Sequence, residues 1–234
     1  HIPRGKFIVL LGKSGSGKST FLETLGLMNN TIISGQVRFF PEPDTSPLLI
    51  TDLWDRNESL KLSEIRRQYM SFIFQHTNLM PNLSALENIC ISQMIQGVPY
   101  QQAADEALKI MQRVGIEAVN DGRTAINLSG GQRQRVAFVR AISAGFNVLF
   151  GDEPTGNLDE FNTRDLIKIL VESINKNGKS VIVVSHNIDI ALMYADEIIV
   201  ISKGNNHSSG FIVPGNILKS ENGSKQQKQW FTLN

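Results

Sequence analysis

The sequence predicts an α/β fold with a largely parallel sheet and a helical lobe inserted into it. Apolar runs of strand length alternate along the chain with helix-like segments, an order that is typical of this class. Most of these runs are unbroken rather than alternating with polar residues, as in strands whose two faces are both covered. Between residues 79 and 143 the segments have helical period, with no strand among them. We therefore expect a layered core that carries a helical insertion.

The individual elements follow in chain order. An apolar run at residues 7–11 is the first expected strand, and a helix-period segment begins at residue 21. Further strands are expected at residues 36–40, 71–74, 148–150, 181–185 and 198–201. Helices are expected at residues 84–96, 100–114 and 131–142. Residues 41–47 are rich in proline, and prolines so spaced cannot lie inside a sheet, so this segment is expected on the surface.

Changes in composition divide the chain into four expected parts. These are a first part of the core at residues 1–78, the helical lobe at 79–143, a second part of the core at 144–204 and a polar tail at 205–234. The tail is rich in Asn, Ser, Gly, Lys and Gln, so we expect it to be weakly ordered. Trp230 and Phe231 near its end are either a docking anchor or part of a frayed terminus.

Composition narrows the function classes. The 234 residues carry a formal net charge of +1, so the chain lacks the basic surplus that drives nucleic-acid binding, and no nucleic-acid partner is expected. The single cysteine, Cys90, cannot form an internal disulfide, which fits a reducing compartment. No apolar run approaches the roughly 18 residues that cross a bilayer, and no signal-peptide pattern opens the chain. We expect a soluble chain whose connection to a membrane runs through a partner.

The stretch GKSGSGKST lies between the first strand and the helix that follows it. Gly12, Gly17, Lys18 and Ser19 have the spacing G-x-x-x-x-G-K-[ST], in which backbone N–H groups wrap phosphates, the lysine reaches the outer ones and the hydroxyl binds Mg²⁺. The alternative is a solvated Gly/Ser turn, but a linker does not normally join a strand to a helix. The expected nucleotide-binding residues here are Gly12, Lys13, Ser14, Gly15, Ser16, Gly17, Lys18, Ser19 and Thr20.

Two adjacent carboxylates close the expected strand in the sequence FGDEP. Asp152 has the position from which a strand-end aspartate holds Mg²⁺ in nucleotide hydrolases. Glu153 is then placed beside the terminal phosphate, where it can polarise a water molecule. An ordinary acidic strand end is the alternative interpretation, and the phosphate loop argues against it.

A second anion-binding helix start is expected in the sequence LSGGQRQRVAFVRAI. Ser129 is a good N-cap, and Gly130 and Gly131 leave the first helical N–H groups bare. One subunit can hardly reach the same terminal phosphate from both sides. We therefore expect an isologous pair of subunits, in which each helix start closes over the nucleotide that the other subunit holds.

Together these residues resemble the ATP-binding-cassette family over about residues 5–204. The motifs that occur in the family's order are the phosphate loop Gly12 to Ser19, Gln75, Leu128-Ser129-Gly130-Gly131-Gln132, Asp152-Glu153, Asn157-Leu158-Asp159 and His186. The resemblance implies a P-loop NTPase core of the RecA-like type that binds ATP and Mg²⁺. It implies that Ser19, Gln75 and Asp152 contact the metal.

The same resemblance implies the remaining roles. Glu153 is the general base, His186 contacts the γ-phosphate, Lys18 and Gln75 assist catalysis, and Asp159 bridges the two subunits. The residues Ser129, Gly130, Gly131 and Gln132 bind the nucleotide of the partner. Residues 74–89 and 152–159 look most like the subfamily that powers lipoprotein release, macrolide export and FtsE-type cell-division complexes.

The sequence departs from the family pattern at its start. A cassette of this family carries additional residues before the phosphate loop, which form antiparallel strands and supply an aromatic residue that stacks on adenine. Here the sequence begins at His1, eleven residues before Gly12. No residue can be given the stacking role. Either the N-terminal antiparallel strands are truncated, as we expect, or the base is held differently and more weakly.

The sequence thus predicts a Mg²⁺-dependent ATP hydrolase that forms a homodimer with two ATP molecules at its interface. It is expected to serve an integral membrane permease-type subunit, in the cytoplasm at the inner face of the membrane. Two alternatives stay open: a soluble regulatory or nucleic-acid-associated clamp, and an ATP-binding module with little turnover. Clamps of that kind insert long coiled coils, and the sequence lacks the sustained heptads that these need.

Overall fold

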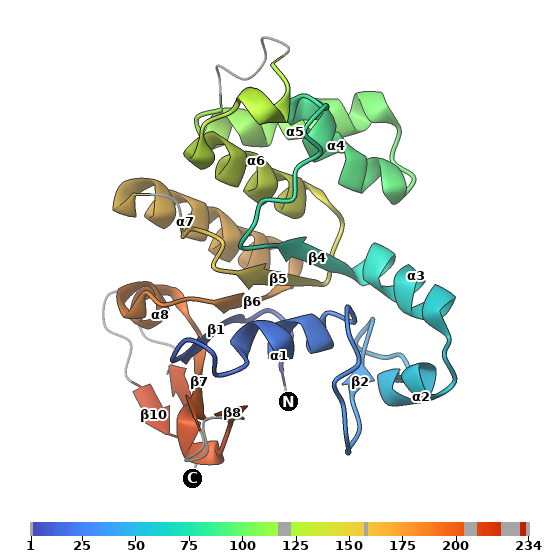
Figure 1. The fold of residues 1–234 in the computed structure, drawn as a ribbon, viewed down its shortest axis with the longest axis vertical. Helices are drawn as coiled ribbons and strands as arrows, with labels where there is room; N and C mark the ends of the chain where they lie inside the picture. The colour runs from blue at the N-terminus through green and yellow to red at the C-terminus, as the bar shows by residue number, and fades with distance from the viewer. Residues whose placement is uncertain (1, 117–122, 157–158, 204–209, 221–229, 233–234) are drawn as a thin grey trace.

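A single large sheet runs through the molecule and carries most of its helices (Figure 1). The computed structural model describes residues 2–116, 123–156, 159–203, 210–220 and 230–232. The strand order is β10-β9-β7-β1-β6-β5-β4, and β8 pairs with β7. The parallel strands are β1 (Phe7–Gly12), β4 (Met70–Ile73), β5 (Val148–Asp152), β6 (Ser180–Val184) and β7 (Glu197–Lys203). The antiparallel strands are β8 (Gly210–Phe211), β9 (Ile217–Ser220) and β10 (Trp230–Thr232).

Both faces of the parallel sheet are covered, as the unbroken apolar runs predict. Along β1, Phe7 and Val9 pack into one hydrophobic cluster, whereas Ile8 and Leu10 pack into another on the opposite face. All four side chains are at most 1% exposed. The alternation arises because successive side chains of a strand point to opposite faces of the sheet.

The helices divide between these two clusters. On the face of Ile8 lie α1 (Lys18–Leu25), α2 (Ile50–Asp55) and α3 (Ser59–Tyr69). On the face of Phe7 lie α4 (Ala85–Ile95), α5 (Tyr100–Arg113), α6 (Gly130–Ser143), α7 (Glu160–Asn177) and α8 (Ile188–Tyr194). Short 3-10 helices occur at η2 (Ala125–Asn127) and η3 (Pro214–Asn216). The α/β fold with a mostly parallel sheet is therefore confirmed.

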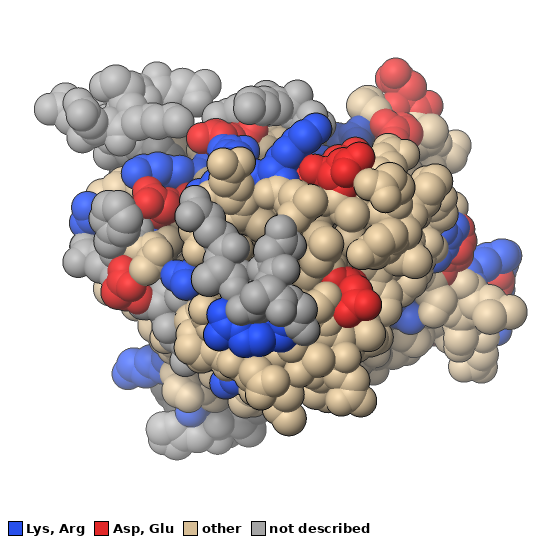
Figure 2. All heavy atoms as spheres, turned by 90° about the horizontal axis from the view of Figure 1, so that it is seen from above, with Lys and Arg blue, Asp and Glu red and all other residues tan. Residues whose placement is uncertain are grey.

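The helices α4, α5 and α6 form a lobe at one end of the molecule (Figure 1). Its helices begin and pack as the sequence favours: α4 is capped by Ser84, and α5 buries Ala103, Ala107 and Met111 on one face. Seen from the end where this lobe lies, basic and acidic side chains are interspersed among neutral ones (Figure 2). None of the helices in the described ranges is both long and apolar enough to cross a membrane.

The sequence expectation for residues 36–40 is corrected. Residues 36–40 were expected among the strands of the parallel sheet, but β2 (Arg38–Phe39) pairs antiparallel with β3 (Leu48–Leu49) in a separate two-stranded sheet. The proline-rich segment 41–47 reverses the chain directly after β2, so the returning residues are the nearest pairing partner.

The expectation of a weakly ordered tail is wrong for residues 210–220 and 230–232. Ile217 and Leu218 of β9 pair with Ile199 and Ile198 of β7, and β10 pairs with β9. Ile217 and Leu218 are apolar and half-buried, and their pairing with β7 extends the sheet although the surrounding composition is polar. Trp230 and Phe231 lie in β10, so their backbone is part of the sheet.

Candidate functional site

The carboxyl ends of four neighbouring strands bring the predicted site residues to one edge of the sheet. In the register, Leu10 of β1 lies beside Val184 of β6, and Val184 lies beside Asp152 of β5. The residues that follow these ends are the phosphate loop after β1, His186 after β6, Asp152 and Glu153 at the end of β5, and Gln75 after β4. In open parallel sheets ligands bind at this edge.

The phosphate loop joins β1 to α1 through glycines in backbone conformations that other residues rarely adopt. Gly15 and Gly17 have φ values of 70° and 88°, and Gly17 is the N-cap of α1. At Gly12 an added Cβ atom would lie 2.6 Å from the carbonyl oxygen of Ile201 and 2.8 Å from Ser16 Oγ. The loop therefore needs glycine at position 12 for space and at positions 15 and 17 for conformation.

Lys18 is folded back over the loop that precedes it. Its Nζ atom donates hydrogen bonds to the carbonyl oxygens of Gly12 at 2.9 Å and Lys13 at 3.0 Å. The side chain is 6% exposed although it is charged. A buried ammonium group needs oxygen partners, and the loop carbonyls hold it in the interior of the loop, where it can meet an anion.

The interior of the phosphate loop also contains the buried hydroxyl group of Ser16. Ser16 is 2% exposed, and its Oγ atom has no hydrogen-bond partner among the described residues. Such a buried polar atom normally has a partner, so the free hydroxyl fits a loop that is shaped for a polar ligand. The other loop side chains, Lys13, Ser14, Ser19 and Thr20, are exposed.

Glu153 directly follows β5 in a left-handed backbone conformation. Its φ is 48°, a value that is uncommon for a residue other than glycine. Its backbone N–H bonds to the carbonyl oxygen of Val184 at 3.1 Å, and its Oε1 atom lies 2.8 Å from His186 Nε2. The backbone geometry turns the Glu153 carboxylate towards the end of β6, where it meets the imidazole. A carboxylate and an imidazole so placed can hold and orient a water molecule.

The donor set fits a magnesium ion that is shared with a nucleotide. Ser19 supplies a hydroxyl oxygen, Gln75 an amide oxygen and Asp152 a carboxylate oxygen, which are ligands that Mg²⁺ prefers. No group of three or more His, Cys, Asp or Glu side chains forms a metal cluster within the described ranges. Magnesium is usually held by one or two carboxylates together with substrate phosphates, so a single aspartate here is sufficient.

The start of α6 is closed by a capping box. Ser129 Oγ accepts a hydrogen bond from the Gln132 N–H at 3.2 Å, and Gln132 Oε1 accepts one from the Ser129 N–H at 2.9 Å. The spacing S-x-x-Q is a sequence signal for this motif, which our sequence interpretation of a bare helix start did not include. Gly130 and Gly131 lie within the box, and an added Cβ at Gly130 would meet nothing within 4 Å.

Asp159 has a local role in the structure as the N-cap of α7. Its Oδ1 atom accepts a hydrogen bond from the Asn162 N–H at 2.9 Å. The two preceding residues of the expected motif, Asn157 and Leu158, lie outside the described residues. An exposed capping aspartate can contact a second subunit as well, so this geometry leaves the bridging role a proposal.

Two side chains of α6 that the sequence interpretation missed bind the loops of the core. Gln134 donates from Nε2 to the carbonyl oxygen of Pro154 at 2.6 Å. Arg140 donates to the carbonyl oxygens of Thr77 at 2.9 Å and Asn78 at 2.8 Å. Burial lowers the pKa of Arg140 from its usual value. The same helix thus contacts the loop after Glu153 and the loop after Gln75.

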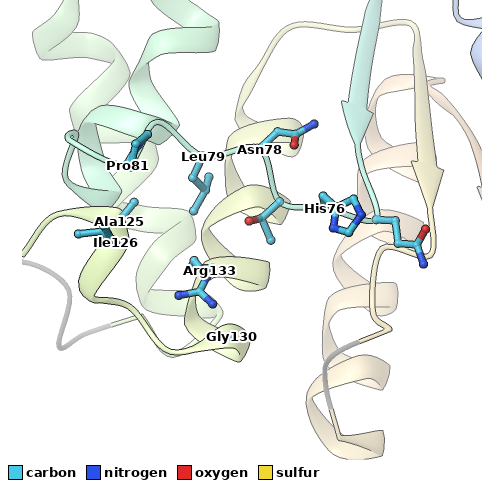
Figure 3. Close-up of a pocket in the computed structure, with 10 residues that line it drawn as sticks. His76, Asn78, Leu79, Pro81, Ala125, Ile126, Gly130 and Arg133 are labelled. Atoms are coloured by element: carbon cyan, nitrogen blue, oxygen red, sulfur yellow. The ribbon is translucent and has the colours of Figure 1, made fainter.

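A pocket of about 440 Å³ separates the start of α6 from the loop after β4. Its walls include His76 and Asn78 of the loop, and Gly130 and Arg133 of α6 (Figure 3). Gln75 lines it too. The structure therefore brings Gln75 and the start of α6 to one pocket, whereas the phosphate loop, Glu153 and His186 do not line it.

Comparison with known proteins agrees with this arrangement. A family model described as ABC transporter matches residues 1–156. The macrolide export ATP-binding/permease protein MacB of Vibrio parahaemolyticus is 36% identical over 204 residues, which cover 87% of this chain and 29% of that protein. The chain therefore spans less than a third of the length of this relative. The lipoprotein-releasing system ATP-binding protein LolD of Idiomarina loihiensis is 37% identical over 187 residues, which cover 80% of this chain and 77% of that protein.

Solved structures agree as well. The bacterial ABC transporter cassette MJ0796, whose structure is dimeric, matches with a TM-score of 0.76 and 30% identity over 90% of this chain and 85% of that one. A post-hydrolysis state of the same cassette, bound to ADP and Pi, matches with a TM-score of 0.74 and 32% identity over 86% of this chain and 82% of that one. The order of motifs, the strand-end site and these matches agree, and the chain belongs to the ABC transporter family with the fold of its ATP-binding cassette.

Proposed function

We propose that the chain is a Mg²⁺-dependent ATP hydrolase that works as a pair of copies and drives a membrane transporter or a related complex. The observation that carries this proposal is the convergence of the phosphate loop, Asp152, Glu153, His186 and Gln75 at the ends of four adjacent strands. A site that only bound nucleotide would need the phosphate loop, but it would not need a carboxylate held beside an imidazole at the same edge.

In this proposal the loop amides and Lys18 bind the phosphates of ATP. Ser19, Asp152 and Gln75 would hold Mg²⁺, which would neutralise phosphate charge. Glu153 orients a water molecule for in-line attack on the γ-phosphorus, and His186 contacts the γ-phosphate. The left-handed backbone at Glu153 supports its role, because strained geometry in proteins concentrates at functional sites.

A second copy of the chain completes each site in this proposal. At the start of α6, Gly130 and Arg133 line the pocket with Gln75, and no residue of the phosphate loop does. The residues Ser129 to Gln132 are proposed to serve the nucleotide of the partner instead. ATP binding closes the pair and hydrolysis opens it. The dimeric structure of the related cassette MJ0796 supports this arrangement.

An integral membrane permease is the proposed partner of the pair, and the inner face of the cell membrane is the proposed location. Two relatives support this: one is described as an ATP-binding/permease protein for macrolide export and the other as part of a lipoprotein-releasing system. A permease segment that contacted the pocket between the Gln75 loop and α6 would touch both parts that respond to nucleotide. The resemblance to these two relatives favours export or release as the direction of work.

The test of this proposal is the substitution Glu153→Gln. The variant is expected to keep the stabilisation of the protein by MgATP but to lose about 10²-fold or more of its ATP turnover, since a general base is typically worth 10² to 10⁴. The neutral amide can still hold a water molecule but cannot accept its proton. Glu106→Gln, at an exposed position of α5, is the matched control and should turn over normally. Near-normal hydrolysis by Glu153→Gln would remove the catalytic role from this residue.

A further inference from the structure

Gln134 is a fully buried glutamine whose amide is only half satisfied. It lies in the second turn of α6 and is 0% exposed. Its Nε2 atom donates to the Pro154 carbonyl oxygen at 2.6 Å, whereas its Oε1 atom has no partner among the described residues. A buried acceptor without a partner destabilises a protein. An apolar side chain of similar size would avoid that cost but would take a donor away from the carbonyl oxygen of the buried Pro154, so the bond to Pro154 is what the glutamine provides at this position.

The acceptor of this bond belongs to the turn that carries Glu153. Pro154 follows Glu153 directly, and the turn closes with a hydrogen bond from the Gly156 N–H to the Glu153 carbonyl oxygen at 3.1 Å. On its other side the turn is held by the bond from the Glu153 N–H to Val184. The backbone of Glu153 is in the left-handed region, and such a conformation persists only when surrounding contacts enforce it. The Gln134 bond fixes the peptide group between Pro154 and Thr155, one peptide beyond the strained residue.

We propose that Gln134 is a positioning residue that holds the Glu153 turn in its catalytic geometry and links it to the orientation of α6. This inference rests on the proposed role of Glu153 as the general base. The start of α6 is also the segment proposed to meet the nucleotide of the partner. The bond between Gln134 and Pro154 would therefore connect the contact with that nucleotide to the general base Glu153. A shift of α6 would move the Pro154 carbonyl oxygen and with it the direction of the Glu153 side chain.

A second buried glutamine provides a comparison within the same lobe. Gln93 of α4 is 2% exposed, and neither its Oε1 nor its Nε2 atom has a partner among the described residues. The two side chains share residue type, burial and helical setting. They differ in that only Gln134 bonds to the turn after Glu153. Replacing each by methionine therefore separates the effect of the bond from the effect of burying an amide.

The experiment compares Gln134→Met with Gln93→Met in the full-length protein, isolated with its membrane partner. Methionine keeps the length of the side chain and removes the unpaired acceptor, so Gln93→Met should melt at the native temperature or above it. In Gln134→Met the lost bond to the Pro154 carbonyl oxygen offsets part of that gain, so its melting temperature should stay close to the native value. Gln134→Met should lower kcat at least tenfold and leave the Kd for MgATP unchanged, since a small misplacement of a catalytic group is enough for such a loss. Hydrogen exchange of the Gly156 amide should become faster. Gln93→Met should change neither kcat nor this exchange rate.

The outcomes that overturn the inference are distinct from those that overturn the proposed function. Native kcat and native Gly156 exchange in Gln134→Met would show that the bond positions nothing. A lower melting temperature with an equal loss in MgATP affinity would assign Gln134 a structural role and reject the inference as well. Glu153→Gln is measured in parallel. If it retains turnover, the proposed base is wrong, whereas loss of turnover in Glu153→Gln with native kcat in Gln134→Met rejects the inference alone.

Discussion

Lys18 shows at the scale of one residue how the phosphate loop prepares for an anion. Its ammonium group is buried and bonded to two carbonyl oxygens of its own loop. These neutral partners satisfy its hydrogen-bonding capacity in part but do not neutralise its charge. A phosphate that entered the loop would supply the missing negative charge, so this residue should contribute strongly to nucleotide binding.

The substitution Lys18→Ala should abolish the stabilisation of the protein by MgATP. A ligand at about 100 times its Kd adds about 2.7 kcal/mol to the free energy of unfolding, which corresponds to roughly 5–10 °C in melting temperature for a chain of this size. Differential scanning calorimetry with and without MgATP measures the shift. Lys109→Ala, at an exposed position of α5, is the control and should keep it. An undiminished shift in Lys18→Ala would rule out the phosphate-loop assignment.

Single residues differ in how far the sequence could predict them. The phosphate loop could be predicted, because its glycines, lysine and hydroxyls all lie within nine consecutive residues at fixed spacing. The ends of β4, β5 and β6 could be predicted from apolar runs followed by polar residues. The bonds of Gln134 and Arg140 could not, because each joins α6 to a loop that is distant in sequence, and only the packed structure defines that approach.

At the scale of elements, α4 and α6 begin with the same local device. Ser84 and Glu87 form a capping box at α4, as Ser129 and Gln132 do at α6. The Ser84 N–H and hydroxyl lower the pKa of Glu87 from its usual value, with the backbone hydrogen bond as the larger cause. Only the box at α6 has the two glycines between its members, and only α6 lies at the pocket with Gln75. We therefore expect the two caps to contribute alike to stability and to differ in function.

Substitution of each capping serine by alanine should separate the contribution of the cap to stability from its contribution to ATP turnover. Ser84→Ala and Ser129→Ala should each lower the free energy of unfolding by about 0.5–2 kcal/mol, the usual value of a lost N-cap. Ser129→Ala alone should lower ATP turnover, because its hydroxyl and the adjoining amides are proposed to meet the nucleotide. Urea unfolding measures the first effect and steady-state hydrolysis the second. Equal turnover in the two variants would contradict a functional role for the start of α6.

The elements that the sequence predicts well are those with one dominant signal. The parallel strands are largely apolar runs, and α5 and α6 have a helical period in which burial and periodicity agree. The strands β8 and β9 have two and four residues in a polar stretch, so no apolar run predicts them. A strand was expected at β2, but its antiparallel pairing with β3 was not. Their positions depend on which neighbour is available for pairing, and this is decided by the rest of the sheet.

At the scale of the whole molecule, one half of the proposed site lies on the sheet and the other half lies on the helical lobe. The phosphate loop and Glu153 are at the edge of the sheet, and Ser129 is at the start of a helix in the lobe. The exposed side chains Ser14 and Ser129 mark these two halves. A shared site predicts that these serines approach each other between two copies when MgATP is bound.

The most direct measurement is crosslinking between two variants that each have one added cysteine, Ser14→Cys in one chain and Ser129→Cys in the other. Both carry Glu153→Gln to hold the closed state, and Cys90 is buried with a pKa raised by burial, so it should not react. A short bifunctional thiol reagent should join the two different chains, and MgATP should increase the yield strongly over nucleotide-free protein. The Lys18→Ala background should lose this increase. A yield that MgATP does not change would contradict a nucleotide site completed by a second copy of the chain.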